Sequence, residues 1–460
     1  MTSGKVNFVH LHVHTAYSLL DSTLRLSDLF KKAKEYQMPA IAMTDHGNLF
    51  GAIEFYKQAN EAGIKPIIGC ELYIAPRSRF EKTVSNTGDA SRHLVVLVKN
   101  IQGYKNLLRM VTASNLEGFY HHPRVDKEIL QQCHEGLIAT SSCLHGEVAS
   151  YILKGDREAA IKAACEYQDI FGEGNFYLEI MENELPEQKI VNEGILEISH
   201  LLSIPVVATN DCHYLRADDA EAHEVLQCIK MCKTLDDKVR IHCKTNQFLR
   251  SPSEMKHLFS YCPEAISNTV VIADKCNLFL ELDSARSVKF HLEKESALNE
   301  YLSTISDKGR DYIFRYVMEQ CGIDHVAKII AFRRMRAKSA IHKIGRALHI
   351  SSADVDAIAN MIHDVRNFSL EDALTMDVRL QEEAIKSEKI QKLLSILKTL
   401  NGLIINLSTY ASGMVISDKP IVDMVPLCLD SKDNLVSQYS INDLQSMGLS
   451  IFKFSIVQCK

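Results

Sequence analysis

Histidines that alternate with aliphatic residues near the start of the chain constrain its fold more than any other sequence feature. Residues 8–15 read Phe-Val-His-Leu-His-Val-His-Thr, so His10, His12 and His14 recur at every second position. Because side chains of a β-strand point alternately to opposite faces, the three imidazoles are predicted to share one face. The aliphatic residues on the other face would anchor the strand and hold nitrogen ligands at a fixed spacing before any ion binds.

Other short apolar segments also run into side chains that bind metals well. They are residues 40–46, 64–71, 136–143 and 204–213, whereas His93 begins its segment instead of ending it. The predicted metal ligands are His12, His14, Asp21, His46, Glu71, His93, Cys143, Asp211 and His213. Ligands gathered at strand ends are typical of barrel enzymes with several metal ions, so phosphoester hydrolysis is the leading chemistry.

Helix-period segments separate these strands and predict the fold class. Leu26, Leu29, Phe30 and Ala33 form one such apolar stripe. Strands that alternate with helices imply a parallel sheet. With residues 93–98 and 176–180, the predicted strands number seven, which favours an α/β fold with a distorted seven-stranded (β/α) barrel.

The ligand types indicate the ions and the role of the cysteine. Imidazoles, carboxylates and one thiolate suit zinc or another transition metal better than magnesium, which prefers oxygen ligands and water. Ions about 3.5–4 Å apart can hold a phosphodiester and activate water, so no serine or cysteine nucleophile is required. Cys143 is therefore interpreted as a ligand.

Four more residues near the predicted ligands have two readings each. Asp45 and His10 either orient ligands or make ordinary strand-end hydrogen bonds. Arg92 and His145 either touch a substrate phosphate or are solvated surface residues, and the second reading is preferred.

Several motifs resemble the N-terminal PHP (polymerase and histidinol phosphatase) domain of the alpha subunit of bacterial DNA polymerase III. They are HLHVHTAYSLLD, AMTDHGNLFGAIEFY, GIKPIIGCELYIA, GLIATSSCLHGEV and ATNDCHYLRADDAEAHEVLQCI, and the resemblance runs from Phe8 to about Asn277. It implies a cluster of three divalent ions (zinc, manganese or iron), held by the nine residues named above. It also implies a 3′ to 5′ exonuclease. The catalytic set would be His12, His14, Asp21, His46, Glu71, Asp211 and His213.

The resemblance continues downstream but departs where polymerase chemistry would lie. Residues 306–317, 322–330 and 412–420 look like parts of the polymerase palm, which implies a smaller, helix-rich α+β remnant. The family's Asp-x-Asp pair falls at Leu302–Thr304, and its third aspartate falls at Lys453. The sequence also departs from the family at Ile405, Asn406 and Tyr410, and a Gly-rich stretch before the palm is missing. Polymerases need such carboxylates to hold two magnesium ions, so polymerase activity is expected to be absent.

Composition limits the possible binding partners and the cellular compartment of the protein. The net charge of −6 provides no general attraction to DNA. A basic stretch (Arg333, Arg334, Arg336, Lys338, Lys343 and Arg346) is interpreted as a solvated helix face in preference to a phosphate-binding one. Thirteen cysteines without paired short spacings predict reduced thiols in the cytoplasm, and Cys228 and Cys232 are expected to pack and not to bind zinc. No membrane segment or secretory signal is expected.

These inferences predict three parts: residues 1–280 as a PHP phosphoesterase domain, 281–306 as a junction, and 307–460 as a degenerate palm-like region. The predicted function is a metal-dependent 3′ to 5′ exonuclease or phosphatase that acts on single-stranded or primer 3′ ends of DNA and contacts replisome proteins. The alternatives are a replication scaffold with structural metals and a truncated relative of a DNA polymerase.

Overall fold

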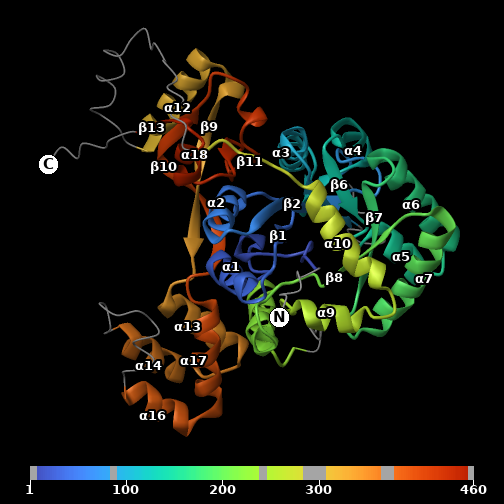
Figure 1. The fold of residues 1–460 in the computed structure, drawn as a ribbon. Coiled ribbons are helices and arrows are strands. Elements are labelled where there is room, and N and C mark those ends of the chain that lie inside the picture. The colour runs from blue at the N-terminus through green and yellow to red at the C-terminus, as the bar shows by residue number, and fades with distance from the viewer. Residues whose placement is uncertain (1–7, 83–90, 238–245, 283–306, 364–377, 454–460) are drawn as a thin grey trace.

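The computed structural model describes residues 8–82, 91–237, 246–282, 307–363 and 378–453. A curled sheet surrounded by helices forms one body (Figure 1). In that view the helices of residues 26–62 lie between a second sheet above them and a separate group of helices below them. The predicted α/β fold with a helix-rich remainder is thus confirmed. The expected junction at 281–306 lies outside the described residues except for Glu281 and Leu282.

Within the described residues, the first body contains ten α-helices and eight strands, where seven strands were predicted. The strands are β1 (Ala40–Met43), β2 (Lys65–Ile74), β3 (Arg92–Val98), β4 (Phe119–Tyr120), β5 (His122–Val125), β6 (Leu137–Thr140), β7 (Phe176–Met181) and β8 (Val206–Thr209). The helices are α1 (Leu26–Glu35), α2 (Ala52–Ala62), α3 (Ile101–Leu116), α4 (Lys127–Cys133), α5 (Glu147–Leu153), α6 (Arg157–Phe171), α7 (Pro186–Leu202), α8 (Ala220–Lys230), α9 (Pro252–Leu258) and α10 (Pro263–Lys275).

The order of the sheet is β4-β5-β2-β3-β6-β7-β8, with β1 paired to β2. Strand β3 runs antiparallel to both β2 and β6, so the prediction of a wholly parallel sheet is wrong. A parallel return needs a crossover connection, and the described part of the link from β2 to β3 contains no helix. The reversal explains why His93 begins its strand: the start of β3 lies at the edge where β2 and β6 end.

The Phe8–Thr15 segment is extended but is not the regular strand that was predicted. It lies between β1 and the residues after β8, since Ala42 N donates to His10 O (2.9 Å) and His14 N donates to Cys212 O (2.8 Å). Threonine side chains take other amides: Val13 N donates to Thr44 Oγ1 and Val9 N donates to Thr269 Oγ1. Side-chain acceptors thus replace part of the ladder, and this segment forms a single β-bridge with the described residues, from Val13 to Cys212.

The C-terminal region combines a five-stranded sheet with a helical lobe. The sheet has the order β11-β12-β9-β10-β13 and consists of β9 (Val326–Arg334), β10 (Ile404–Ile416), β11 (Leu427–Leu429), β12 (Leu435–Ser437) and β13 (Ser450–Lys453). Helices α12 (Asp307–Cys321) and α18 (Ile441–Ser446) accompany it. We define the helical lobe as α13 (Ala337–Ala347), α14 (Ser352–His363), α16 (Val378–Lys386) and α17 (Glu388–Leu400).

The basic stretch is only partly helical, because Arg333 and Arg334 end β9 and Arg336 precedes α13. All six of its basic residues are exposed, whereas Ile341 and Ile344 are buried, as expected for a solvated helix face.

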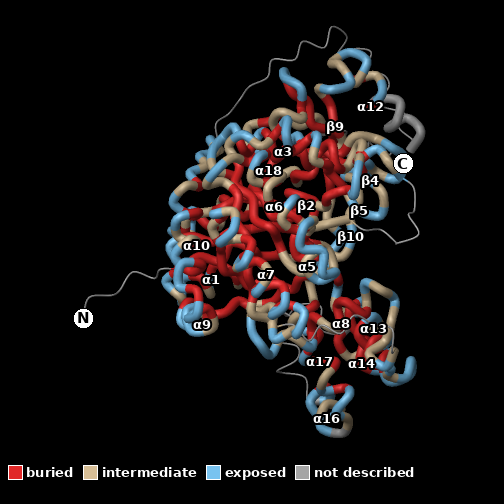
Figure 2. Tube along the Cα trace, turned by 90° about the vertical axis from the view of Figure 1, so that its right-hand side faces the viewer, coloured by how far each residue is buried: buried red, intermediate tan, exposed pale blue. Residues whose placement is uncertain are grey.

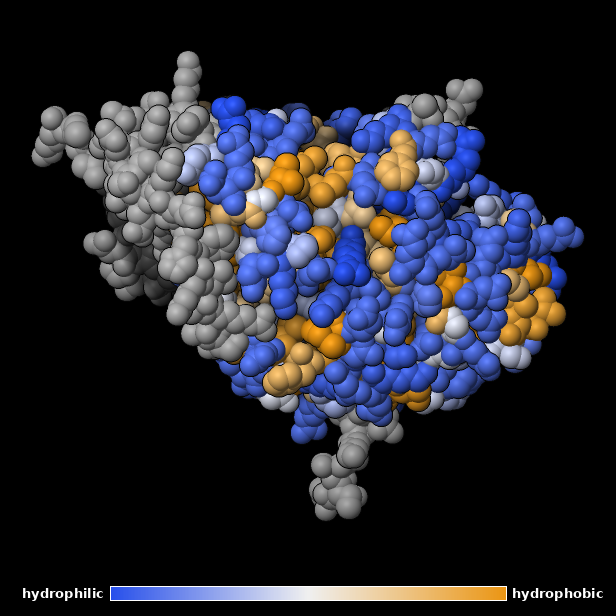
Figure 3. Space-filling view, turned by 90° about the horizontal axis from the view of Figure 1, so that it is seen from above, coloured by the Kyte–Doolittle hydropathy of each residue, from blue (hydrophilic) through white to orange (hydrophobic). Residues whose placement is uncertain are grey.

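Burial continues from the first body into both C-terminal parts (Figure 2). Ile329 of β9 and Val415 of β10 belong to the same apolar cluster as the barrel helices. Seen from above, the surface is mostly hydrophilic, with hydrophobic residues in separate groups (Figure 3). None of the helices in the described ranges is both long and apolar enough to cross a membrane.

Candidate metal centre

All nine predicted ligands meet in one cluster, and Glu71 lies at its middle. Its side chain is 1% exposed. Glu71 Oε1 lies 3.3 Å from His12 Nε2 and 3.2 Å from His93 Nδ1. Glu71 Oε2 lies 3.5 Å from His14 Nε2 and 2.8 Å from His46 Nδ1. One buried carboxylate therefore faces four imidazoles, which is the arrangement expected of a carboxylate shared by neighbouring ions.

The most compact group is His12, His14, Glu71 and Asp211. The two Nε2 atoms of His12 and His14 lie 3.1 Å apart, and each is 3.2 Å from Asp211 Oδ1. In a tetrahedral zinc site with bonds of about 2.0–2.2 Å, the ligand atoms are separated by about 3.3–3.6 Å. The spacing of this group is close to that requirement.

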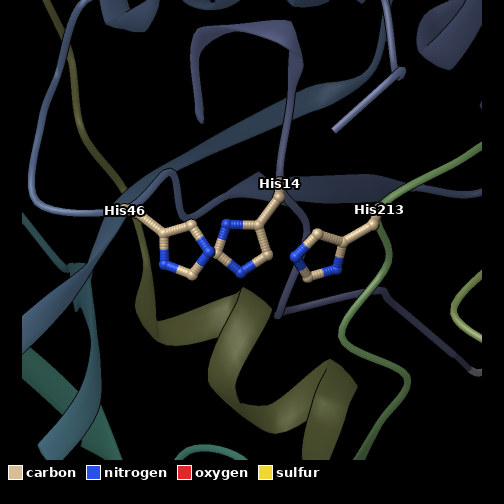
Figure 4. Close-up of side chains that lie close together, drawn as sticks. All are labelled: His14, His46 and His213. Carbon is tan, nitrogen blue, oxygen red and sulfur yellow. The ribbon is translucent and has the colours of Figure 1, made fainter. Parts of the chain in front are cut away.

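Two further groups adjoin the first one. In one, Cys143 Sγ lies 3.7 Å from His93 Nδ1 and 3.9 Å from Glu71 Oε1. In the other, the ring of His14 lies between those of His46 and His213, with centroids 4.0 Å and 4.4 Å away (Figure 4). Asp21 joins this group because its Oδ2 lies 3.0 Å from His46 Nε2. Three overlapping groups could thus each hold an ion.

The charges of the cluster fit bound cations. Burial by itself would lower the pKa of His46, but Asp21 and Glu71 outweigh it and raise that pKa to about 10. Burial likewise opposes the charge of His12, yet Asp211, Glu179 and Glu71 raise its pKa well above the ordinary value. The buried carboxylates thus stabilise positive charge at His46 and His12, as they would on a bound cation.

Asp211 Oδ1 and His46 Nδ1 lie within 3.2 Å of other members of the cluster, but neither buried atom makes a hydrogen bond of good geometry within the described part of the chain. An unsatisfied buried polar atom is costly and calls for an ion or another partner. Burial, together with Glu71 and Asp211, raises the pKa of the Cys143 thiol well above its usual range. Ligation by Cys143 therefore requires a cation to stabilise the thiolate. The donor set and the orphaned atoms together fit transition ions.

Glu179 is a supporting residue that the sequence analysis did not single out. It is buried in β7, where its Oε1 accepts a hydrogen bond at 2.7 Å from His12 Nδ1. Thr140 and Thr209 donate to the same carboxylate. A carboxylate on the far nitrogen of a ligating histidine sets the tautomer and the ring orientation. The available signal was a single charged residue inside an otherwise apolar strand.

The two candidates for orienting ligands have different surroundings. Asp45 accepts hydrogen bonds from Thr15 N at 2.6 Å and from Ser18 Oγ at 2.6 Å, and Ser18 Oγ lies 3.2 Å from His14 Nδ1. Asp45 thus supports His14 through a serine. His10 instead contacts Arg250 O at 2.9 Å and Cys212 Sγ at 3.6 Å. Of the three imidazoles of the first segment, those of His12 and His14 therefore join the cluster, whereas His10 makes hydrogen bonds away from it.

The remaining sequence candidates lie beside the cluster. The ring of His145 is 5.3 Å from that of His93, and Arg92 is the residue before His93 in β3. Cys228 is buried in α8 and Cys232 is exposed after it, and neither belongs to a candidate metal group among the described residues.

The C-terminal sheet carries a cavity of about 680 Å³ with a different charge pattern. Its charged lining residues are Lys328, Arg333, Asp430 and Lys432. Asn406 and Tyr410, where the sequence departs from the polymerase pattern, line it as well. The positions Leu302–Thr304 lie outside the described residues, as does the side chain of Lys453.

Comparisons with known proteins place the chain in a family. Residues 10–183 match the family model described as "PHP domain", and residues 303–456 match the model described as "Bacterial DNA polymerase III alpha NTPase domain". The chain is a PHP-domain relative of the bacterial DNA polymerase III alpha subunits. The resemblance inferred from the motifs is thus confirmed.

The relatives named "DNA polymerase III subunit alpha" match nearly the whole chain. The protein of Borreliella burgdorferi is 34% identical and that of Treponema pallidum 31% identical, each over 97% of this chain and over 48% and 47% of the relative. The protein of Thermus aquaticus is 29% identical over 97% of this chain and 50% of the relative. The chain therefore spans about half the length of the curated relatives it matches.

The alignment with the Borreliella protein extends over 553 positions, more than the 460 residues of this chain. The aligned part of that relative thus includes segments that have no counterpart here.

Proposed function

We propose that this protein is a metal-dependent phosphoesterase that removes nucleotides from the 3′ end of DNA. The observation that carries the proposal is the convergence of nine metal-type side chains, each of which lies within 3.9 Å of another member. We assign the ligand role to all nine and the catalytic role to the seven that exclude His93 and Cys143. Zinc, manganese and iron fit this donor set.

The protein's own residues would position the ions and the substrate. Bound ions would supply positive charge for the phosphate and lower the pKa of a water molecule. Glu179 holds His12, and Asp45 holds His14 through Ser18, so the ligands are fixed before the substrate arrives.

Several members of the cluster reach solvent. The side chains of Asp21, His93, His46 and Asp211 are 17%, 15%, 12% and 12% exposed, whereas those of His12 and His14 are fully buried. A phosphate would therefore approach past the exposed members.

Aromatic rings beside this open side favour a nucleic acid over a small phosphate ester. The ring of Tyr73 lies 5.1 Å from that of His93 and stacks on His122 at 4.5 Å. His122 is exposed, and an unpaired base of a single-stranded 3′ end would bind by stacking on its ring.

We further propose that this chain does not polymerise nucleotides and acts with replisome proteins in the cytoplasm. Lysine at position 453 would repel magnesium where the family places an aspartate. The cavity over the C-terminal sheet has Asp430 as its single lining carboxylate within the described ranges. The names of the relatives support DNA and replication proteins as partners.

The test uses the 460-residue protein with Mn²⁺ or Zn²⁺ and three substrates: a 3′-labelled single strand, p-nitrophenyl phosphate and a primed template with deoxynucleotides. We expect label release that disappears in His12→Ala and Asp211→Asn and persists in the control His200→Ala, which changes an exposed histidine of α7. Metal-dependent melting without turnover on any substrate would favour the scaffold. Template-directed incorporation would refute the loss of polymerase activity.

A further inference from the structure

Asp21 lies in a strained loop between the metal centre and the helical lobe. The two residues before it, Leu19 and Leu20, have φ angles of +36° and +58°. A leucine in the left-handed region is unfavourable and persists only where the surroundings hold it there. The conformation that presents Asp21 to His46 therefore depends on contacts made by this loop.

Those contacts come from the helical lobe. Leu20 packs against the apolar cluster formed by the lobe helices. At the other end of the loop, Arg25 Nη2 donates to the carbonyl of Thr399 at 2.8 Å and also to the carbonyl of Asn401. Thr399 belongs to α17 and Asn401 is its C-cap, so the end of one lobe helix binds the loop.

Helix α8 joins the same two parts through opposite faces. On one face, His223 Nε2 lies 2.9 Å from Asp21 O, Gln227 Nε2 donates to Asp21 Oδ1, and Lys230 Nζ lies 3.2 Å from Asp21 Oδ2. These three residues recur at helical spacing along one stripe. Gln227 donates only to Oδ1 of Asp21. Lys230 pairs with Oδ2, and because its side chain is 42% exposed, water can replace Lys230 there.

The other face of α8 packs against the lobe. Ala222, Val225 and Leu226 lie in the same apolar cluster as Ile344 and Leu397. Glu221 pairs with Lys392 of α17. A displacement of the lobe would therefore move both the loop of Asp21 and the helix that holds its carboxylate.

We propose that the helical lobe completes the Asp21 side of the metal centre, so that ion binding there and docking of the lobe stabilise each other. The inference rests on the proposed metal-binding function, with Gln227 and Arg25 as positioning residues. Because such coupling is reciprocal, loss of lobe contacts weakens ion binding and loss of the ion loosens the lobe.

The first experiment counts zinc ions in the full chain after dialysis against zinc-buffered solutions. Arg25→Ala and Gln227→Ala should bind one zinc ion about tenfold or more weaker than the unaltered protein. The matched control is Arg109→Ala, which removes the 2.7 Å ion pair to Asp423 elsewhere between the first body and the C-terminal region. This control should bind zinc as the unaltered protein does. Circular dichroism verifies that each variant is folded.

The second experiment needs no positioning variant. Hydrogen exchange of α8 and α17 should be slower with zinc than with a chelator in the unaltered protein, and zinc should protect neither helix in Asp21→Asn. The proposal would be overturned if zinc binding were unchanged in Arg25→Ala and Gln227→Ala. It would also be overturned if the hydrogen exchange of α17 were the same with zinc and with a chelator. Both readouts are independent of turnover, so a protein that shows the coupling but hydrolyses nothing would refute only the proposed function.

Discussion

The candidate metal centre and the cavity over the C-terminal sheet differ in charge, although both lie beside buried apolar residues of one cluster. Three carboxylates and a thiol contribute to the metal centre, whereas the cavity is lined by three basic residues and one acid. The C-terminal sheet keeps its five strands and its buried face although the described lining of its cavity has Asp430 as its single carboxylate. The comparison shows that apolar packing maintains a fold independently of the few polar residues that give it a chemistry.

The sharpest test of this contrast removes one charge from each region. In Glu71→Gln, hydrolysis of a 3′-labelled strand should fall about a thousandfold or more, which corresponds to about 4 kcal/mol. The reason is that four imidazoles face this one carboxylate. Asp430→Asn in the cavity should hydrolyse the strand at the original rate. A Glu71→Gln variant that kept most of its activity would remove the basis of the contrast.

Removal of the ions should lower the free energy of unfolding, and this effect should be smaller than the effect of Glu71→Gln on hydrolysis. If one ion is present at a hundred times its dissociation constant, its removal lowers the free energy of unfolding by about 2.7 kcal/mol. Urea unfolding followed by circular dichroism, with zinc and then with a chelator, measures the difference. Asp211→Asn should show less dependence on zinc, and a midpoint that is the same in both buffers would contradict a metal centre.

The role of Glu179 predicts an effect on affinity. Glu179→Gln should weaken zinc binding by about tenfold to a hundredfold, because the amide no longer holds the His12 tautomer by charge. Zinc titration against a competing chelator provides the measurement. The matched control is Glu182→Gln, whose carboxylate bonds to Tyr261 at 2.8 Å away from the cluster. Equal affinities in the two variants would assign Glu179 to packing alone.

Asp430 should stabilise the folded protein, and this contribution should depend on pH. Burial opposes its charge, but hydrogen bonds from Asn434 and Lys432 and the nearby Lys328 leave its pKa below the ordinary value. A lowered pKa in the folded state stabilises the protein above the unfolded pKa, and this contribution is lost as the pH falls through the folded value. Asp430→Asn should therefore cost about 1 kcal/mol at pH 7, and the cost should vanish in acid. Urea unfolding at several pH values tests this, and a cost that did not change with pH would contradict it.

The sequence predicted the residues that gather at the candidate site, but it did not predict the residues that hold them in place. Alternation and strand-end positions identified His12, His14 and the other predicted ligands, which the structure brings together. The role of Glu179 was not predicted, because the sequence of β7 does not show that its carboxylate contacts His12. The two alternatives for His10 stayed open for the same reason, since its contacts to Arg250 and Cys212 come from distant segments.

The sequence by itself determined the residue types, the short apolar segments and the lack of acidic residues at Leu302–Thr304 and Lys453. Tertiary structure alone decided that β3 runs in reverse, that Thr44 and Thr269 interrupt the first strand, and that the lobe reaches the loop of Asp21. The physical reason is that side-chain periodicity is a property of neighbouring residues. Strand direction and long-range hydrogen bonds depend instead on which distant segments pack together.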